Sequence, residues 1–330
     1  MSERVIFDFE KPLYELEDQI EKLKKSAEKN KKLNVNSEVK ALEKKLAKLQ
    51  KDIYAKLSSW EKTQIARHPK RPYTLDYIDL LFTDFVELHG DRRFSDDEAI
   101  VGGFAKLDGL KVMVIGHQKG RDLKDNMRRN YGMANPEGYR KAMRLMFLAE
   151  KFKLPIITFV DTPGAYPGLG GEERGQAEAI AYNLEKMSSL RVPTISVIIG
   201  EGGSGGALGI AVTNVVLMLE NSIYSVISPE GCASILWKDA TKANEAANAM
   251  GITADRLYKL GVVDEIIKEP LGGAHRNYEK TAENVKNAIV KNLKKMKNQS
   301  ADTLVNNRYK KFRKLGEFFD KGKLVTSKIS

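Results

Sequence analysis

The sequence is 330 residues long, 42% hydrophobic and 30% charged, which is the balance of an ordinary globular protein, and we expect a cytoplasmic location. No apolar run approaches the roughly 18 residues that cross a bilayer, which argues against a membrane protein. The net charge is +11, but aromatic residues do not interleave with the basic runs, so nucleic-acid binding is not expected as the main function. A phosphate-bearing ligand or an acidic protein partner accounts for the charge equally well.

The first segment, residues 1–72, is predicted to hold a helical hairpin over residues 12–60. Apolar residues recur at steps of three and four in two runs, separated by a polar turn at Lys29–Ser37. The runs are Leu13, Leu16, Ile20 and Leu23, then Val39, Leu42, Leu46, Leu49 and Ile53. Because each stripe is short, a free-standing coiled coil is disfavoured, and we expect the hairpin to cover part of the core or a partner subunit.

Residues 73–270 are predicted to form an α/β core. Short apolar runs alternate with helical stretches, which is typical of strand–helix–strand units with parallel pairing. The expected strands are Lys111–Ile115, Ile156–Val160, Thr194–Ile199 and Val215–Leu219. The expected helices are Tyr139–Lys151, Gln176–Leu190 and Ala207–Val212. Residues 271–330 follow as a helical, lysine-rich segment that packs on the core or faces a partner, and its last ten residues are expected to form a solvated tail.

A glycine-rich segment, Gly200–Gly206, connects the expected strand Thr194–Ile199 to a helix of small residues. Glycines at such a turn let the backbone approach a ligand and direct free N–H groups at negative charge. The segment therefore predicts a site for an anion or an oxyanion, but its pattern fits three different chemistries.

The first chemistry is dinucleotide binding. Gly200, Gly202 and Gly205 satisfy the G-x-G-x-x-G pattern, and Glu220 follows at the distance of a ribose-binding acid, so a nicotinamide-dependent oxidoreductase is an alternative. Against it, this motif usually opens its domain, whereas here it lies deep in the chain.

The second chemistry is a nucleophile elbow, with Ser204 in a G-x-S-x-G pattern. Asp264 and His275 follow in the order of a hydrolase triad. A five-residue pattern is easily met by chance in a stretch this rich in glycine, so the pattern is weak evidence.

The third chemistry is an oxyanion hole without a side-chain nucleophile, in which the N–H groups of Gly205 and Gly206 do the work. A second loop of similar design, Asp161–Gly171, follows the expected strand Ile156–Val160 and is stiffened by Pro163 and Pro167. Two such loops one crossover apart are expected to converge on one ligand.

Long motifs in this chain resemble the carboxyltransferase α subunit of bacterial acetyl-CoA carboxylase, and the resemblance covers nearly the whole sequence. The motifs are Val86–Arg92, Asn135–Lys141, Asp161–Gly168, Gly200–Leu208, Ser228–Asp239 and Glu269–Arg276. The resemblance implies a crotonase-like (ClpP/crotonase) core of stacked ββα units, with the N-terminal helical hairpin and a C-terminal helical segment. It also implies transfer of a carboxyl group from carboxybiotin to acetyl-CoA, which forms malonyl-CoA for fatty acid synthesis.

The same resemblance implies partners. The enzyme would be active only with a β subunit, as an α2β2 assembly, together with a biotin carboxyl carrier protein and biotin carboxylase. In this family the β subunit supplies the thioester oxyanion hole and a zinc finger, whereas the α subunit handles biotin. That agrees with the composition, because one cysteine and four scattered histidines predict no metal site in this chain.

Site residues follow from the loops and the resemblance together. The expected oxyanion donors are the backbone N–H groups of Gly205, Gly206, Gly164 and Ala165. The expected substrate-binding residues are Gly202, Gly203, Ser204, Tyr166 and Pro167.

Several further residues receive more modest interpretations. We expect Glu172, Glu173 and Arg174 to cap a helix, Cys232 to be a small core residue, and His275 to make structural hydrogen bonds. A polar loop contributes basic residues that contact coenzyme A phosphates, contact the β subunit or are merely solvated, and the sequence leaves these options open. They are Lys119, Arg121, Arg128 and Arg129.

Overall fold

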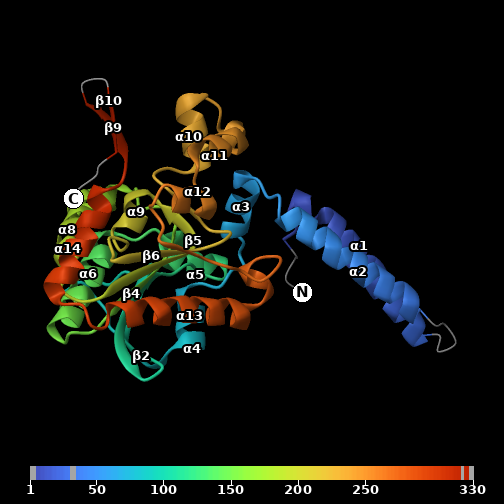
Figure 1. Ribbon diagram of the computed structural model, residues 1–330, viewed down its shortest axis with the longest axis horizontal. Coiled ribbons are helices and arrows are strands. Elements are labelled where there is room, and N and C mark those ends of the chain that lie inside the picture. Colours follow the sequence, from blue (N-terminus) through green and yellow to red (C-terminus); the bar gives the residue numbers. More distant parts are fainter. Residues whose placement is uncertain (1–4, 30–34, 321–322, 327–330) are drawn as a thin grey trace.

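The computed structural model describes residues 5–29, 35–320 and 323–326 of the chain. An α/β body carries a two-helix arm on one side and a short two-stranded hairpin near the C-terminus (Figure 1). The strands are β1 (Thr83–Glu87), β2 (Ile100–Leu107), β3 (Leu110–His117), β4 (Ile156–Thr162), β5 (Thr194–Gly203), β6 (Val215–Leu219), β7 (Ile223–Ser225), β8 (Glu265–Ile267), β9 (Glu317–Asp320) and β10 (Lys323–Thr326). The helices are α1 (Lys11–Lys29), α2 (Asn36–Tyr54), α3 (Ser59–Ala66), α4 (Thr74–Leu81), α5 (Leu123–Arg128), α6 (Pro136–Lys151), α7 (Leu169–Glu173), α8 (Gln176–Ser189), α9 (Ser204–Leu208), α10 (Pro229–Leu236), α11 (Ala243–Met250), α12 (Ala254–Lys259), α13 (Tyr278–Met296) and α14 (Ala301–Arg313).

The main sheet is mixed, with the order β1-β2-β3-β4-β5-β6-β8 and with β7 paired to the end of β5. Strands β1, β2 and β3 are antiparallel, whereas β3, β4, β5, β6 and β8 run parallel to one another. Every residue of β4 and β5 is buried, as expected for parallel strands that are covered on both faces. The predicted α/β core with parallel pairing is therefore confirmed.

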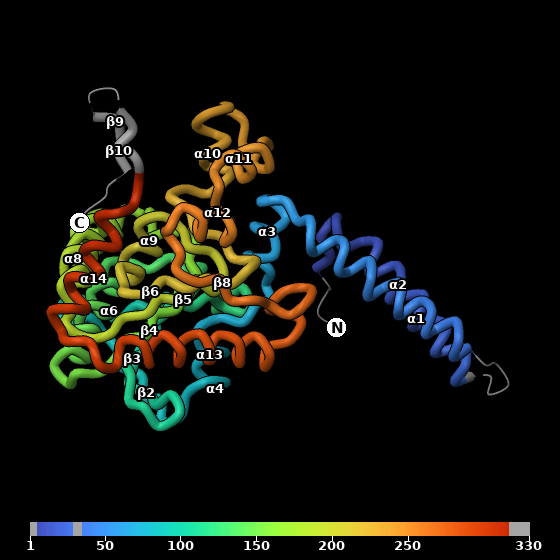
Figure 2. The backbone as a smooth tube through the Cα atoms, viewed as in Figure 1, coloured from blue at the N-terminus to red at the C-terminus, as the bar shows by residue number. Residues whose placement is uncertain are grey.

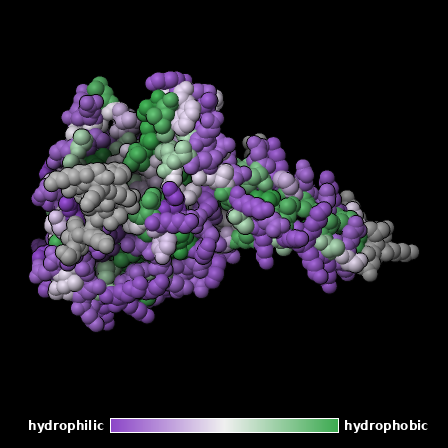
Figure 3. Space-filling model, turned by 45° about the horizontal axis from the view of Figure 1, so that its top comes forward, coloured by the Kyte–Doolittle hydropathy of each residue, from purple (hydrophilic) through white to green (hydrophobic). Residues whose placement is uncertain are grey.

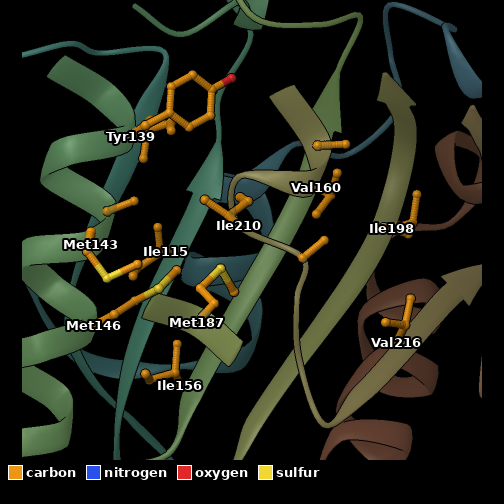
Figure 4. Packing of buried hydrophobic residues seen from close by; sticks show 14 of the residues in the cluster. Ile115, Tyr139, Met143, Met146, Ile156, Val160, Met187, Ile198, Ile210 and Val216 are labelled. Atoms are coloured by element: carbon orange, nitrogen blue, oxygen red, sulfur yellow. The ribbon is translucent and has the colours of Figure 1, made fainter. Parts of the chain in front are cut away.

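Two hydrophobic layers cover the sheet. On one face α6 and α8 pack against the strands, and Figure 4 shows Met143 and Met146 of α6 beside Ile115 of β3 and Ile156 of β4. On the other face α4, α13 and the start of α14 cover the same strands. The site at the strand ends is thus supported by a sheet with a packed core on both sides.

The N-terminal hairpin forms and projects from the body (Figure 1), so of the two predicted roles it does not cover the core, and contact with a partner subunit stays a prediction. Helices α1 and α2 run side by side away from the body (Figure 2), and in Figure 3 a narrow hydrophobic stripe lies between hydrophilic residues along the arm. The base of the arm is anchored where the Arg276 Nη2 donates to the Tyr14 hydroxyl over 3.1 Å. Residues 30–34 of the predicted turn lie outside the described residues, and α2 begins at Asn36, slightly earlier than predicted.

Three element boundaries differ from the predictions. Strand β5 continues to Gly203, because its last residues pair with β4 and β7, so half of the glycine-rich segment is strand. Helix α9 spans Ser204–Leu208 instead of Ala207–Val212, and the residues after Gly209 form turns. In the predicted solvated tail, Lys323–Thr326 form β10, which pairs with β9; residues 321–322 and 327–330 lie outside the described residues.

Candidate active site

Two glycine-rich loops meet at one edge of the sheet. Strands β4 and β5 are parallel neighbours, and Thr162 at the end of β4 is aligned with Gly202 of β5. A Cβ added to Gly203 would lie 2.1 Å from the Pro163 carbonyl oxygen, and one added to Gly206 would lie 2.6 Å from the Ala165 nitrogen. Such distances are possible only because both residues are glycines, so the two loops are in backbone contact.

Backbone N–H groups are available at this contact. Gly205 and Gly206 lie in the first turn of α9, where N–H groups lack helical acceptors, and no side chain caps that helix. Among the described residues the N–H of Ala165 has no acceptor. The N–H of Gly164 was predicted to be a free oxyanion donor. In the structure it donates a hydrogen bond to the Thr162 hydroxyl over 3.1 Å.

The predicted substrate-binding residues differ in how deeply they are buried. Gly202 and Gly203 are buried inside β5, where Gly203 permits the close approach of the loop Asp161–Gly171. Tyr166 is half-buried and held by its backbone, since its N–H donates to the Ala134 carbonyl over 3.0 Å, whereas Pro167 is exposed. Ser204 is half-buried and has a φ of 51°, a left-handed conformation that strains a residue with a side chain.

A buried carboxylate ties the two loop-bearing strands together. Oδ1 of Asp161 accepts a hydrogen bond from the Glu201 backbone N–H over 3.0 Å and from the Lys119 Nζ over 2.6 Å. Burial by itself would lower the pKa of Lys119, but the charge of Asp161 outweighs burial and holds that pKa above its ordinary value. Sequence reasoning missed Asp161 as a bridge, because its partners lie 42 and 40 residues away.

A second charged cluster supports the end of β5. Arg67, which directly follows α3, donates from Nη2 to Glu201 Oε1 over 2.7 Å and from Nη1 to Glu230 Oε1 over 2.6 Å. The side chain of Glu201 is 6% exposed, so its charge is neutralised largely by Arg67. No local pattern signals this cluster, which joins three separate segments of the chain.

His117, at the end of β3, is fully buried beneath the loops. Burial first, and the nearby Lys119 charge second, lower the pKa of His117 to about 3. The ring is therefore neutral at physiological pH, and it adds no positive charge beneath the loops.

The hydrolase triad does not form. The Asp264 carboxylate accepts hydrogen bonds from the Val216 N–H and from Lys311. The His275 ring stacks on His68, with centroids 3.9 Å apart. Neither is therefore placed to activate Ser204. The expected structural hydrogen bonds of His275 are also wrong, because its ring nitrogens have no partner in the described part of the chain.

All four basic residues of the polar loop form ion pairs within the chain, so the option that they are merely solvated is wrong. Lys119 pairs with Asp161, Arg121 with Asp76, and both Arg128 and Arg129 with Asp125.

The remaining single-residue interpretations are partly confirmed. Glu172 lies in the first turn of α7, as expected for a capping acid, but Arg174 pairs with Glu137 over 2.8 Å. Cys232 is only half-buried, so it is not the core residue that we expected. Glu220, the ribose-binding candidate, accepts from Lys268 Nζ over 2.5 Å.

Residues 5–29, 35–320 and 323–326 contain no group of three or more histidine, cysteine, aspartate or glutamate side chains that could hold a metal ion. Within the same ranges, no helix combines the length and the apolar character needed to cross a bilayer.

Comparison with known proteins identifies relatives along almost the whole chain. Residues 6–316 match the family model described as acetyl co-enzyme A carboxylase carboxyltransferase-like. The acetyl-coenzyme A carboxylase carboxyl transferase subunit alpha of Geobacter metallireducens is 61% identical, with 96% of this chain and 99% of the relative covered. The subunit of the same name from Pasteurella multocida is 58% identical, with 94% and 98% covered.

Solved structures show the same fold at low sequence identity. Transcarboxylase 12S superposes with a TM-score of 0.57 at 19% identity, over 71% of this chain and 44% of that one. A Pseudomonas malonate decarboxylase hetero-tetramer in complex with coenzyme A gives a TM-score of 0.57 at 18% identity, over 71% and 91%. The expected crotonase-like fold is confirmed by these neighbours, and the oxidoreductase alternative receives no support from the relatives.

Proposed function

The chain belongs to the family of acetyl-CoA carboxylase carboxyltransferase α subunits, and from this we propose that its two touching loops form the oxyanion site of carboxyl transfer. The enzyme of this family transfers a carboxyl group to acetyl-CoA and forms malonyl-CoA for fatty acid synthesis. One observation supports the assignment of the site: the loops are in backbone contact, and in the described part of the chain the nearby N–H groups of Gly205, Gly206 and Ala165 have no acceptor.

The chemistry needs charge stabilisation rather than a nucleophile from this chain. Carboxybiotin, presented by a biotin carboxyl carrier protein, supplies the carboxyl group and a ureido oxygen on which negative charge develops. The N–H groups of Gly205, Gly206 and Ala165 hold that charge by hydrogen bonds that are already oriented before the reaction. Backbone donors suit this role, because the ion pairs beneath them fix both loops and leave little reorganisation for the reactive step.

Proton transfer is not assigned to a side chain of this subunit. Among the titratable groups beneath the loops, Asp161 and Lys119 neutralise each other and His117 is buried and neutral. The loops therefore bind and orient, and the proton of the acetyl methyl group is taken up outside this set of residues.

A second subunit completes the site in this proposal. Leu169, the first residue of α7 within the loop segment Asp161–Gly171, is 73% exposed, and Phe94, which lies under Arg174 just after α7, is 67% exposed. Large apolar side chains this exposed beside a reactive site are typical of a surface that a partner covers. We assign this surface to the β subunit of an α2β2 carboxyltransferase, which acts in the cytoplasm with the carrier protein and biotin carboxylase.

The test compares two substitutions at one position. Gly205→Pro removes the N–H at the second residue of α9, where proline is tolerated, whereas Gly205→Ala keeps that N–H. Each variant is co-purified with a β subunit, and malonyl-CoA-dependent carboxylation of free biotin is measured. We expect Gly205→Pro to assemble normally and to lose about 10²-fold or more in kcat, as for removal of one oxyanion donor. Turnover by an assembled Gly205→Pro complex at the rate of Gly205→Ala would show that this N–H is not a donor.

A further inference from the structure

A large cavity lies at the end of the body opposite the glycine-rich loops. Its volume is about 1040 Å³, and Pro155 and Pro193, which line it, directly precede β4 and β5. The loops follow the other ends of these strands. With a rise of about 3.3 Å per residue, the seven residues of β4 separate the cavity from the loops by roughly 23 Å. The cavity is therefore distinct from the carboxyltransferase site.

The walls of the cavity are apolar and come from five parts of the chain. The turn between β2 and β3, the two proline-containing segments, the end of α13 and the start of α14 all contribute. The apolar lining residues are Leu107, Leu110, Pro155, Val192, Pro193, Val290, Leu293, Met296, Ala301 and Leu304. A cavity of this size and character is at the upper end of those that hold small organic ligands.

The rim of the cavity is positively charged. Lys153, Lys294 and Lys297 line it, are exposed, and make no ion pair with any described residue. The two carboxylates of the lining are already engaged. Oδ1 of Asp108 lies 2.5 Å from Lys286 Nζ, and Glu150 Oε1 accepts the Arg191 backbone N–H over 2.7 Å.

From this combination we infer that the cavity binds a single-chain amphiphile with an anionic head group, such as a medium- or long-chain fatty carboxylate. The apolar walls take the hydrocarbon chain, and the three unpaired lysines take the carboxylate at the rim. An uncharged or cationic amphiphile fits the walls but not the rim, so the head-group charge decides binding. The site is independent of the proposed oxyanion role of the loops.

The experiment uses the assembled carboxyltransferase and measures dissociation constants by calorimetry, with decanoate and dodecanoate below their micellar concentrations as probes. We expect one bound molecule per α subunit. Affinity should rise about fourfold per added methylene, which is the fold-change that corresponds to about 0.8 kcal/mol. Dodecyltrimethylammonium, which has the same chain and the opposite charge, should not bind measurably.

Three variants locate the site. Lys294→Glu combined with Lys297→Glu should weaken dodecanoate binding about tenfold, the effect of two exposed ion pairs of up to about 1 kcal/mol each. Ala301→Trp should abolish binding, because Ala301 is a half-buried lining residue and an indole at this position would occupy cavity volume. Lys310→Glu is the matched control, because Lys310 is an exposed, unpaired lysine on α14 outside the lining, and it should leave affinity unchanged.

Two results would overturn the inference. The first is dodecanoate binding that is absent, or that is equal in all four proteins. The second is loss of subunit assembly, rather than of dodecanoate affinity, in the Lys294→Glu/Lys297→Glu protein, which would mean that a protein partner covers this surface.

Discussion

The contact between the two loops leads to a quantitative prediction for Gly206→Ala. The added Cβ would lie 2.6 Å from both the Ala165 nitrogen and the Gly164 carbonyl carbon. Ordinary van der Waals contact begins at 3.4 Å, so the loop Asp161–Gly171 must move away by the difference, 0.8 Å. Both obstructing atoms are backbone, which means that no side-chain rotation can relieve the clash.

A shift of this size is large for the proposed oxyanion site. Misplacement by about 1 Å can lower a rate by 10²-fold, and loss of one oxyanion donor costs about 10²–10³ in kcat. We therefore expect Gly206→Ala to lower kcat by about 10²-fold with little change in KM for malonyl-CoA. The measurement is malonyl-CoA-dependent carboxylation of free biotin by the complex with a β subunit.

Gly205→Ala is the matched control for this prediction. The same methyl group at the preceding residue would have Ile180 as its nearest neighbour, at 3.7 Å, so the loops need not move. We expect kcat of this variant to stay within about threefold of the parent chain. Equal losses in the two variants, or an unimpaired Gly206→Ala enzyme, would refute the argument that loop contact sets the donor geometry.

Three further predictions concern the residues around the loops. Ser204→Gly should retain most of the biotin carboxylation activity and should raise the free energy of unfolding by about 1 kcal/mol, because it removes a hydroxyl that the mechanism does not use and relieves a positive φ; loss of activity would instead favour a catalytic serine. Asp161→Asn should destabilise the fold by about 3 kcal/mol in urea unfolding, because it leaves Lys119 buried without its partner, and the added change Lys119→Met should restore part of the loss. His117, with a pKa lowered to about 3, stays neutral in the fold while the unfolded chain gains a proton below about pH 6.5. The contribution of His117 to the free energy of unfolding is therefore constant above pH 6.5. That free energy falls as the pH drops from 6.5 towards 3, by about 2 kcal/mol between pH 7 and 5. Urea unfolding at these two pH values should show a smaller difference in His117→Leu, and an unchanged difference would contradict the assignment.

The parallel core was predictable because its strands carry their own signal. Strands β4, β5 and β6 are rich in apolar residues, and all their residues except the half-buried Val215 are buried, so local hydrophobicity reveals them. Of the antiparallel pair β2 and β3, only β3 was predicted. Asp108 and Gly109 form its two-residue turn, both with positive φ, and this Asp-Gly pair is the signal that identifies the hairpin.

The end of β5 could not be predicted from the sequence. Five glycines among the seven residues Gly200–Gly206 suggest a loop, yet Gly202 and Gly203 extend the strand, because pairing with β4 and β7 overrides their weak intrinsic preference. The position of the helical arm could not be predicted either. Its helices were correctly predicted from their periodicity, but no periodicity tells whether a helical hairpin lies on the body or projects from it.

If the proposed donors act as we infer, their exposure gives a physical reason for a chain of this family to work with a partner subunit. Gly205 and Ala165 are only half-buried, so in the isolated chain water competes for their N–H groups. An opposing subunit that covers the exposed Leu169 would exclude this water and lower the local dielectric constant. Electrostatic stabilisation of the same oxyanion by the same donors then becomes considerably stronger. In the proposed mechanism the loops and their buried ion pairs thus supply the geometry, and a partner subunit would supply the dry environment in which that geometry becomes effective.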